Sequence, residues 1–304
     1  MAQYSHLSEA DPEFAPFLAI KAPPPSFVLE ERRKRFAAVI DAGKKSYTPG
    51  LPKETEYQVL DHQVEVEEPT GKILVRTLVP TSQNGGSQTY PLFVWFQGGG
   101  WTDGHLDMDD YHLRATCVEH QISIVNVNYR LAPEHPHPTP LNDCYSALKW
   151  AVSSAEVLRT DLKKGFLVLQ IPPVLHPEAV PEKYKPFLLS YEQNKDAPIL
   201  SRDNITWCFG RLGGSPTDPE ISPLLYPSHK GLAPAVIQVC GMDPLRDEGL
   251  LYESLLKSEG VKTKLTVYPG VPHGFNYSFL HLEIGSRWDK EYKAGVRWLL
   301  DGAP

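Results

Sequence analysis

Hydrophobic and polar residues follow two different patterns along the first half of this 304-residue chain. Over residues 56–80 they alternate, as in Val64–Glu67 and Ile73–Val79, which is typical of strands with one buried face and predicts an antiparallel pair. From residue 90 the pattern changes to short unbroken apolar runs, first Leu92–Phe96 and then Ile122–Val127. Buried strands of this kind, separated by helical stretches, are typical of a mostly parallel sheet.

The alternation of strands and helices continues to the end of the chain with one interruption. Spacing predicts helices over residues 109–120 and 141–152, a helix that contains Leu250 and Leu256 and ends at Gly260, and a terminal helix. It predicts strands over residues 165–171, 235–240 and 264–268. The interruption, residues 176–198, is studded with prolines and fits a lid or cap. We therefore expect one α/β domain over residues 1–304, with cap contributions from residues 1–55 and 176–230.

Charge and composition narrow the classes of partner. The chain has 37 acidic and 30 basic residues, a net charge of -7, so it lacks the basic footprint that a nucleic-acid backbone requires. No apolar run approaches the roughly 20 residues of a membrane helix, and the first residues do not have the composition of a secretory signal. We expect a soluble, cytoplasmic protein without a membrane span.

Metal and cofactor chemistry is not predicted. The four cysteines, Cys117, Cys144, Cys208 and Cys240, lack the paired spacing of a zinc site and are expected to be buried, reduced thiols. No carboxylate stands at ligand spacing from the histidines of the first half, which are His105, His112, His120, His135 and His137. A predicted helix over residues 29–40 carries a basic cluster, Arg32–Arg35, which we interpret as a solvated face because acidic residues precede it.

Three short segments carry candidate chemistry. Gly98, Gly99 and Gly100 follow a predicted strand directly, and consecutive glycines let backbone N–H groups approach a ligand as an oxyanion hole requires. Asp243 comes just after the strand over residues 235–240, and His273 follows the next strand. A carboxylate and then a histidine, each after a strand, is the order of the last two members of α/β-hydrolase triads.

Five motifs in series resemble the hormone-sensitive-lipase-like esterases of the α/β-hydrolase superfamily. The motifs are Gly98–Trp101, Asn128–Pro136, Asp143–Trp150, Asp243–Gly249 and His273–Phe275. The resemblance implies an α/β-hydrolase fold, an eight-stranded, mostly parallel sheet with a helical cap, and hydrolysis of small-molecule carboxylic esters by serine, histidine and aspartate without a cofactor. It assigns Asp243 to orienting the imidazole, His273 to general-base catalysis and Gly98–Gly100 to the oxyanion loop.

The first departure from the family pattern is Gln97, which stands where the family loop usually begins with histidine. The glycine N–H groups survive this change, and a glutamine side chain can still brace the loop by hydrogen bonding.

The second departure is the absence of any Gly-x-Ser-x-Gly sequence, the turn that carries the family's nucleophile. In the family that turn belongs on the strand after Phe166, whereas here Phe166 runs directly into what reads as a later strand. One central strand and helix, roughly 30–40 residues, is therefore expected to be missing. Ser215 cannot replace the nucleophile because Pro216 has no N–H for the oxyanion hole, and Ser153 and Ser154 lie at a helix end without flanking glycines.

Three hypotheses stay open. The chain is an esterase or lipase-like hydrolase by lineage with Asp243 and His273 in place and its serine missing. Alternatively, it is a catalytically inactive pseudo-hydrolase that binds a small ligand or partner, or a truncated or mis-spliced product. The natural ester and the oligomeric state are not predicted.

Overall fold

The computed structural model describes residues 3–19, 26–47, 50–82, 88–162 and 165–304. The chain divides into two units: one contains Ser26–Lys164 and Arg211–Gly213, and the other contains Met1–Pro25, Gly165–Gly210 and Gly214–Pro304. Each unit has its own sheet. The single domain over residues 1–304 stays a prediction, and residues 1–2, 20–25 and 48–49 of the expected cap lie outside the described residues.

The unit around residues 26–164 contains five strands in the order β1-β2-β4-β3-β5. They are β1 (Tyr57–Glu67), β2 (Thr70–Pro80), β3 (Tyr90–Phe96), β4 (Ser123–Asn128) and β5 (Thr160–Asp161). β1 and β2 pair antiparallel, as the alternating pattern predicts, and so do β2 and β4. β3 lies parallel to both β4 and β5, which confirms the predicted change to parallel pairing.

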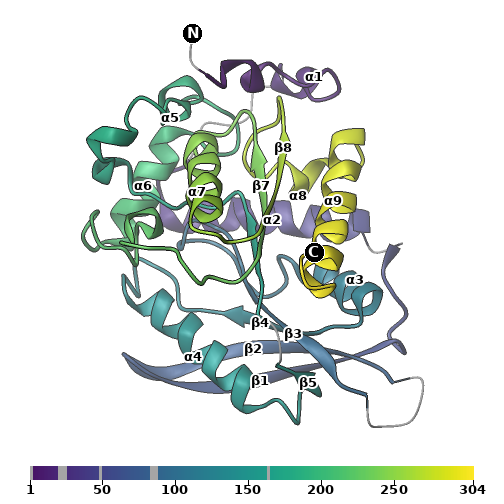
Figure 1. Ribbon diagram of the computed structural model, residues 1–304. Helices are drawn as coiled ribbons and strands as arrows, with labels where there is room; N and C mark the ends of the chain where they lie inside the picture. Colours follow the sequence, from purple (N-terminus) through teal and green to yellow (C-terminus); the bar gives the residue numbers. More distant parts are fainter. Residues whose placement is uncertain (1–2, 20–25, 48–49, 83–87, 163–164) are drawn as a thin grey trace. The chain divides into compact units, whose positions relative to one another are not determined.

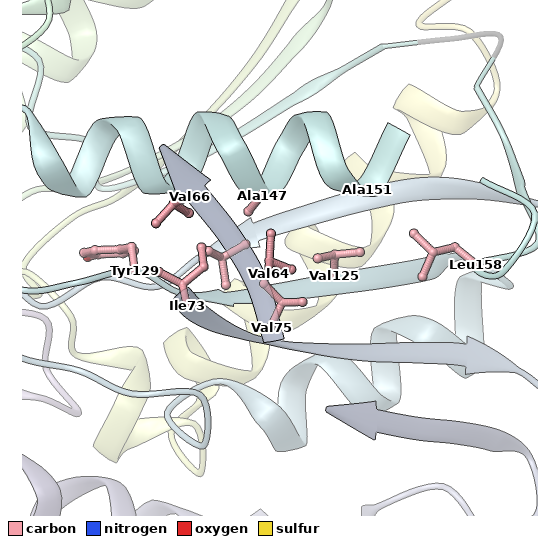
Figure 2. Close-up of a cluster of buried hydrophobic side chains, with 10 residues drawn as sticks. Val64, Val66, Ile73, Val75, Val125, Tyr129, Ala147, Ala151 and Leu158 are labelled. Atoms are coloured by element: carbon pink, nitrogen blue, oxygen red, sulfur yellow. The ribbon is translucent and has the colours of Figure 1, made fainter. Parts of the chain in front are cut away.

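Both faces of this sheet are covered at β4, because successive side chains of a strand point to opposite sides and Ser123–Val127 are all buried. Figure 2 shows Ala147 and Ala151 of α4 (Thr139–Ser153) above valines of the strands, and both alanines belong to a buried cluster with Val64, Val75 and Val125. The small alanines let the helix backbone lie close to the strands. α3 (Asp110–His120) contacts β2 and β4. The unit also contains α2 (Leu29–Tyr47).

The second unit is built on three parallel strands with β7 in the middle. They are β6 (Leu167–Gln170), β7 (Ala235–Cys240) and β8 (Thr263–Tyr268), flanked by α7 (Arg246–Ser258) and α9 (Glu283–Leu300) (Figure 1). Ile237 packs in one cluster with Leu256 of α7, while Val236 faces Gly295 of α9. A Cβ on Gly295 would lie 2.8 Å from Val236 Cγ1, so this glycine allows α9 to lie against the sheet.

The predicted cap residues form short helices rather than one long element. Along residues 172–230 these are η3 (Pro177–Ala179), η4 (Glu182–Tyr184), α5 (Ser190–Gln193), α6 (Arg202–Leu212) and η5 (Pro223–Leu225). The remaining short helices are η1 (Ser5–Ser8), α1 (Ala15–Leu18) and α8 (Asn276–Phe279). Within the described ranges, no helix combines the length and the apolar character that crossing a bilayer demands.

Candidate active site

Asp243 and His273 are neighbours in the structure although 30 residues separate them in the sequence. Each follows the C-terminal end of a parallel strand, β7 and β8 respectively, so the two loops emerge at the same edge of the three-stranded sheet. His273 Nδ1 lies 2.7 Å from Asp243 Oδ2. The pair that chain order predicts is therefore formed.

The geometry of the pair fixes which imidazole nitrogen can act as a base. The side chain of Asp243 is 1% exposed and that of His273 is 22% exposed. Carboxylate oxygens are hydrogen-bond acceptors, so this contact matches the imidazole tautomer in which Nδ1 of His273 donates and Nε2 is an acceptor. Asp243 Oδ1 accepts the N–H of Leu245 at 2.9 Å, which fixes the carboxylate plane. This arrangement directs Nδ1 to the carboxylate and leaves Nε2 as the other imidazole nitrogen available for chemistry.

The Asp243 loop is held by hydrogen bonds and, at Gly241, by a backbone contact too close for a side chain. Met242 donates its N–H to the carbonyl of Val271 at 3.0 Å and so ties the Asp243 loop to the His273 loop. Asn194 Nδ2 donates to the carbonyl of Asp243 at 3.0 Å. At Gly241 a Cβ would lie 2.2 Å from the carbonyl oxygen of Leu7, so only glycine fits there.

The loop that carries His273 is anchored by aromatic packing. Gly274 has φ +69°, a conformation that glycine adopts without steric cost. The next residue, Phe275, is fully buried and meets the ring of Trp288 edge-on, with ring centroids 5.5 Å apart. This anchor sets the direction in which the loop leaves the sheet.

The glycine loop belongs to the other unit and follows β3. Gly99 and Gly100 have φ +118° and +59°, and a Cβ on Gly99 would lie 2.2 Å from the carbonyl oxygen of Asp103. The Gly99 carbonyl accepts the N–H of Asp103 at 3.0 Å and closes the turn. Within the described part of the chain, the N–H groups of Gly98, Gly99 and Gly100 donate no hydrogen bond. They have the free donors that binding an anionic oxygen requires.

Gln97 does not brace this loop as we expected. Its side chain is 4% exposed, and neither its Nε2 nor its Oε1 has a hydrogen-bond partner among the residues described. The loop is held instead through the Gln97 carbonyl, which accepts the hydroxyl of Tyr129 at 2.8 Å, and through Asp103. The expectation is wrong because the side chain lies in a buried space where the structure places no complementary polar group.

The basic cluster Arg32–Arg35 is solvated only in part. Lys34 and Arg35 are exposed, as predicted, whereas the prediction is wrong for Arg32, whose Nε donates to the fully buried Asp103 at 2.6 Å. Arg33 Nε donates to the carbonyl of Thr102 at 2.8 Å, and its guanidinium forms an ion pair with Glu134. These two arginines hold the far side of the glycine loop. The contact joins residues 71 positions apart, which no local pattern indicates.

The serines that the sequence excludes as nucleophiles lie outside any strand-to-helix turn. Ser215 follows α6, is exposed, and pairs with the hydroxyl of Thr217 at 3.1 Å. Ser153 is the last residue of α4, and its hydroxyl donates to the carbonyl of Trp150.

The cysteines offer no alternative nucleophile. All four are free thiols; Cys117, Cys208 and Cys240 are buried as predicted, and Cys144 is half-buried. Burial raises the pKa of Cys117 to about 12 and also raises the pKa values of Cys144 and Cys240 well above the ordinary value, so these three stay protonated at neutral pH.

Comparison with known proteins places the chain in a family. A family model described as alpha/beta hydrolase fold matches residues 93–168 and 166–277. The carboxylic ester hydrolase LipN of Mycobacterium tuberculosis is 34% identical over 68% of this chain and 62% of its own length. The versiconal hemiacetal acetate esterase of Dothistroma septosporum is 36% identical over 61% of this chain and 67% of its own length.

A solved structure extends the likeness over nearly the whole chain. The crystal structure of vibralactone cyclase superposes with a TM-score of 0.94 at 39% identity and covers 98% of this chain and 97% of its own. The chain therefore belongs to the alpha/beta-hydrolase fold family and is of carboxylic ester hydrolase lineage.

Proposed function

We propose that this protein is an ester hydrolase by lineage that has kept the Asp243–His273 base and lost the serine that the base would activate. Ester hydrolysis then proceeds slowly, with water as the nucleophile. The observation that carries the proposal is the 2.7 Å contact of His273 Nδ1 with the buried Asp243, because it leaves Nε2 poised as a base. The substrate class is a small-molecule carboxylic ester, as in the relatives named esterases.

Three observations support the loss of a segment near Phe166. No Gly-x-Ser-x-Gly sequence occurs anywhere in the chain. The strands that flank this position are the shortest of the described chain, with two residues in β5 and four in β6. The family model matches in two stretches that meet at residues 166–168, where the sequence predicts the gap. An absent strand, elbow and helix would account for all three.

The chemistry left to the pair is general-base catalysis. Nε2 of His273 takes a proton from water while the oxygen of that water attacks the ester carbonyl, and Asp243 stabilises the imidazolium that forms. When the tetrahedral intermediate collapses, the imidazolium returns the proton to the leaving alkoxide, giving an acid and an alcohol. The role of Gly98–Gly100 as donors to the tetrahedral oxygen rests on the family resemblance. Sites stripped of triad members keep about 10³–10⁴-fold acceleration over water, far below an intact triad.

The direct test is hydrolysis of a short-chain chromogenic ester by the purified protein and by a His273→Ala variant. We expect slow turnover that falls to the background rate in His273→Ala. The matched control is His6→Ala, which removes an exposed imidazole of the same unit and should change nothing. A fluorophosphonate probe, which labels activated serines, should leave the protein unlabelled.

The outcomes separate the three hypotheses. Turnover that survives His273→Ala, or stoichiometric labelling of a serine, would contradict the proposal. Absence of turnover in a protein that unfolds cooperatively supports the pseudo-hydrolase that binds a ligand or partner. Failure to unfold cooperatively supports the truncated product, and an unspliced Gly-x-Ser-x-Gly segment in the encoding DNA beside the Phe166 codon would explain its origin.

A further inference from the structure

Glu248, the third carboxylate of the motif Asp243–Gly249, lies in the wall of a cavity and has no role in the proposed chemistry. The cavity has a volume of about 240 Å³ and lies wholly within the unit that contains β7. Apolar side chains supply most of its wall, including Leu175, Val180, Leu188 and Pro244. It is smaller than the roughly 300–1,000 Å³ typical of drug-sized sites, so it suits a compact molecule.

Glu248 is buried and only half satisfied. The residue is 8% exposed, and its Oε1 accepts the N–H groups of Val174 at 2.7 Å and Leu175 at 3.2 Å. Oε2 receives no hydrogen bond, and neither oxygen has a cationic partner, among the residues that the structure describes. An ionised carboxylate that is buried without a counter-charge is unfavourable, so such a group either takes up a proton or binds a cation.

The preceding residue in the same helix, Asp247, is a buried carboxylate whose charge is paired. Asp247 is also buried, but its Oδ1 accepts Arg246 Nε at 2.8 Å and its Oδ2 accepts the N–H groups of Leu189 and Ser190. Arg246 thus neutralises Asp247, and Glu248 is left without such a partner. The surroundings are acidic as well, because the charges of Asp243 and Asp247 act on Glu248.

We propose that this cavity is a binding site for a small primary amine with a compact apolar body, whose ammonium group pairs with Oε2 of Glu248. The ammonium supplies the missing counter-charge and the missing hydrogen-bond donor together, and the apolar walls take up the body of the ligand. The site needs neither a serine nor turnover, so it stands or falls independently of the esterase proposal.

Ionisation of Glu248 gives amine binding a definite pH dependence. Burial raises the pKa of Glu248 to about 8, helped by the charges of Asp243 and Asp247. The ionised share of the group therefore rises from roughly one tenth at pH 7 to one half at pH 8. Binding should strengthen about fivefold over this interval and release a proton, because a bound ammonium favours the ionised carboxylate.

The other charged and titratable groups around the cavity do not give the same signature. They are Arg246, which is paired with Asp247; Lys185, which is paired with Glu182; Glu192, which is paired with Arg202; Tyr191; and His176 beside Leu175. Burial lowers the pKa of His176 and raises that of Tyr191, which moves both titrations away from the interval between pH 7 and pH 8.

The test is isothermal titration of the full chain with benzylamine and with benzyl alcohol, its neutral counterpart of similar size. We expect benzylamine to bind at least tenfold more tightly than benzyl alcohol at pH 8 and to release about half a proton per bound molecule, measured in two buffers of different ionisation heat. Equal affinity for the two probes, or no binding of either, would overturn the proposal. This comparison uses the unmodified protein and does not depend on any variant folding.

Two variants sharpen the result. Glu248→Gln keeps an Oε1 that can accept from Val174 and Leu175 but removes the charge, and it should weaken benzylamine at least tenfold and abolish proton release. Glu192→Gln removes a charge at the wall of the same cavity from a residue that is already paired, and it should retain binding. Unchanged benzylamine affinity in a folded Glu248→Gln variant would contradict the role of this carboxylate.

Discussion

The five-stranded and three-stranded sheets are alike at their centres and differ in how each sheet begins and ends. β4 is buried from Ser123 to Val127, and β7 is buried over its whole length. The first sheet starts from a pair of 11-residue strands and ends in β5, which has two residues. The second starts from β6, which has four half-buried residues. Each sheet therefore has its shortest strand at the junction between β5 and β6, where the chain passes from the first sheet to the second.

The candidate catalytic groups follow the long strands, not the short ones. The glycine loop comes after β3, Asp243 after β7 and His273 after β8, and each of these strands has six or seven residues. Full strands anchor the loops at their ends, which accounts for the retained geometry of the base pair. In the family, the nucleophile would lie in the segment that is expected between β5 and β6. The comparison teaches that the candidate groups present in the structure are those that full-length strands support, and under the proposed function these are the parts of the site that the chain has kept.

The largest expected effect comes from inserting the missing segment between β5 and β6. Inserting the strand, Gly-x-Ser-x-Gly turn and helix of an intact relative after Phe166 should raise ester hydrolysis about 10³-fold or more, because the retained base would again have a serine to activate. The measurement is the rate on a chromogenic ester, with the same insert carrying alanine for its serine as the control. A folded, inserted protein whose rate does not exceed that of this control would show that the retained pair is not a catalytic remnant.

The sequence predicts the long strands and the base pair for the same physical reason. Runs such as Leu92–Phe96 and Ala235–Cys240 are mostly apolar because central strands are covered on both faces. Such strands can therefore be recognised from consecutive residues. Parallel strands then bring their C-terminal ends to one edge, so Asp243 and His273 could be paired from chain order alone.

Contacts that depend on distant partners could not be predicted in this way. The ion pair of Arg32 with Asp103 depends on which groups meet in space, and so does the lack of a partner for the Gln97 side chain among the described residues. Neither produces a periodic pattern in the sequence. A strand of two residues such as β5 is too short to carry any period. For that reason the fold class and the base pair were predictable, whereas the support of the glycine loop was not.

A second prediction compares the centre and the start of the three-stranded sheet. Ile237 of β7 and Leu169 of β6 are cross-strand partners in one apolar cluster, but Ile237 is fully buried and Leu169 is half-buried. Ile237→Ala should lower the free energy of unfolding by about 2–5 kcal/mol, because it leaves a cavity in a closed core. Leu169→Ala should cost about 1–2 kcal/mol, since part of its surface is already in water. Urea denaturation measures both, and equal costs would mean that β6 is packed as tightly as β7.

A third prediction concerns the backbone of the glycine loop. Gly99→Ala forces a Cβ to within 2.2 Å of the Asp103 carbonyl oxygen at a φ of +118°, so it should lower the free energy of unfolding by roughly 1–3 kcal/mol. Gly98 is the matched control in the same loop, because its added Cβ would meet only Met108 Cε at 3.9 Å. Gly98→Ala should change stability by less than about 0.5 kcal/mol. Similar losses in both variants would mean that strain at Gly99 is not what shapes the loop.

The smallest expected effect compares one buried amide side chain at the glycine loop with one that is hydrogen-bonded to the Asp243 loop. Gln97 is buried with no hydrogen-bond partner in the described chain, so Gln97→Met gives up no bond and should change the free energy of unfolding by less than about 0.5 kcal/mol. Asn194 is equally buried but donates to the Asp243 carbonyl, and Asn194→Leu should cost about 0.5–1.5 kcal/mol. Thermal or urea unfolding of the two variants measures the difference. If Gln97→Met proved the more costly of the two, the Gln97 amide would have to be bonded in solution, and the glycine loop would depend on its side chain as the Asp243 loop depends on Asn194.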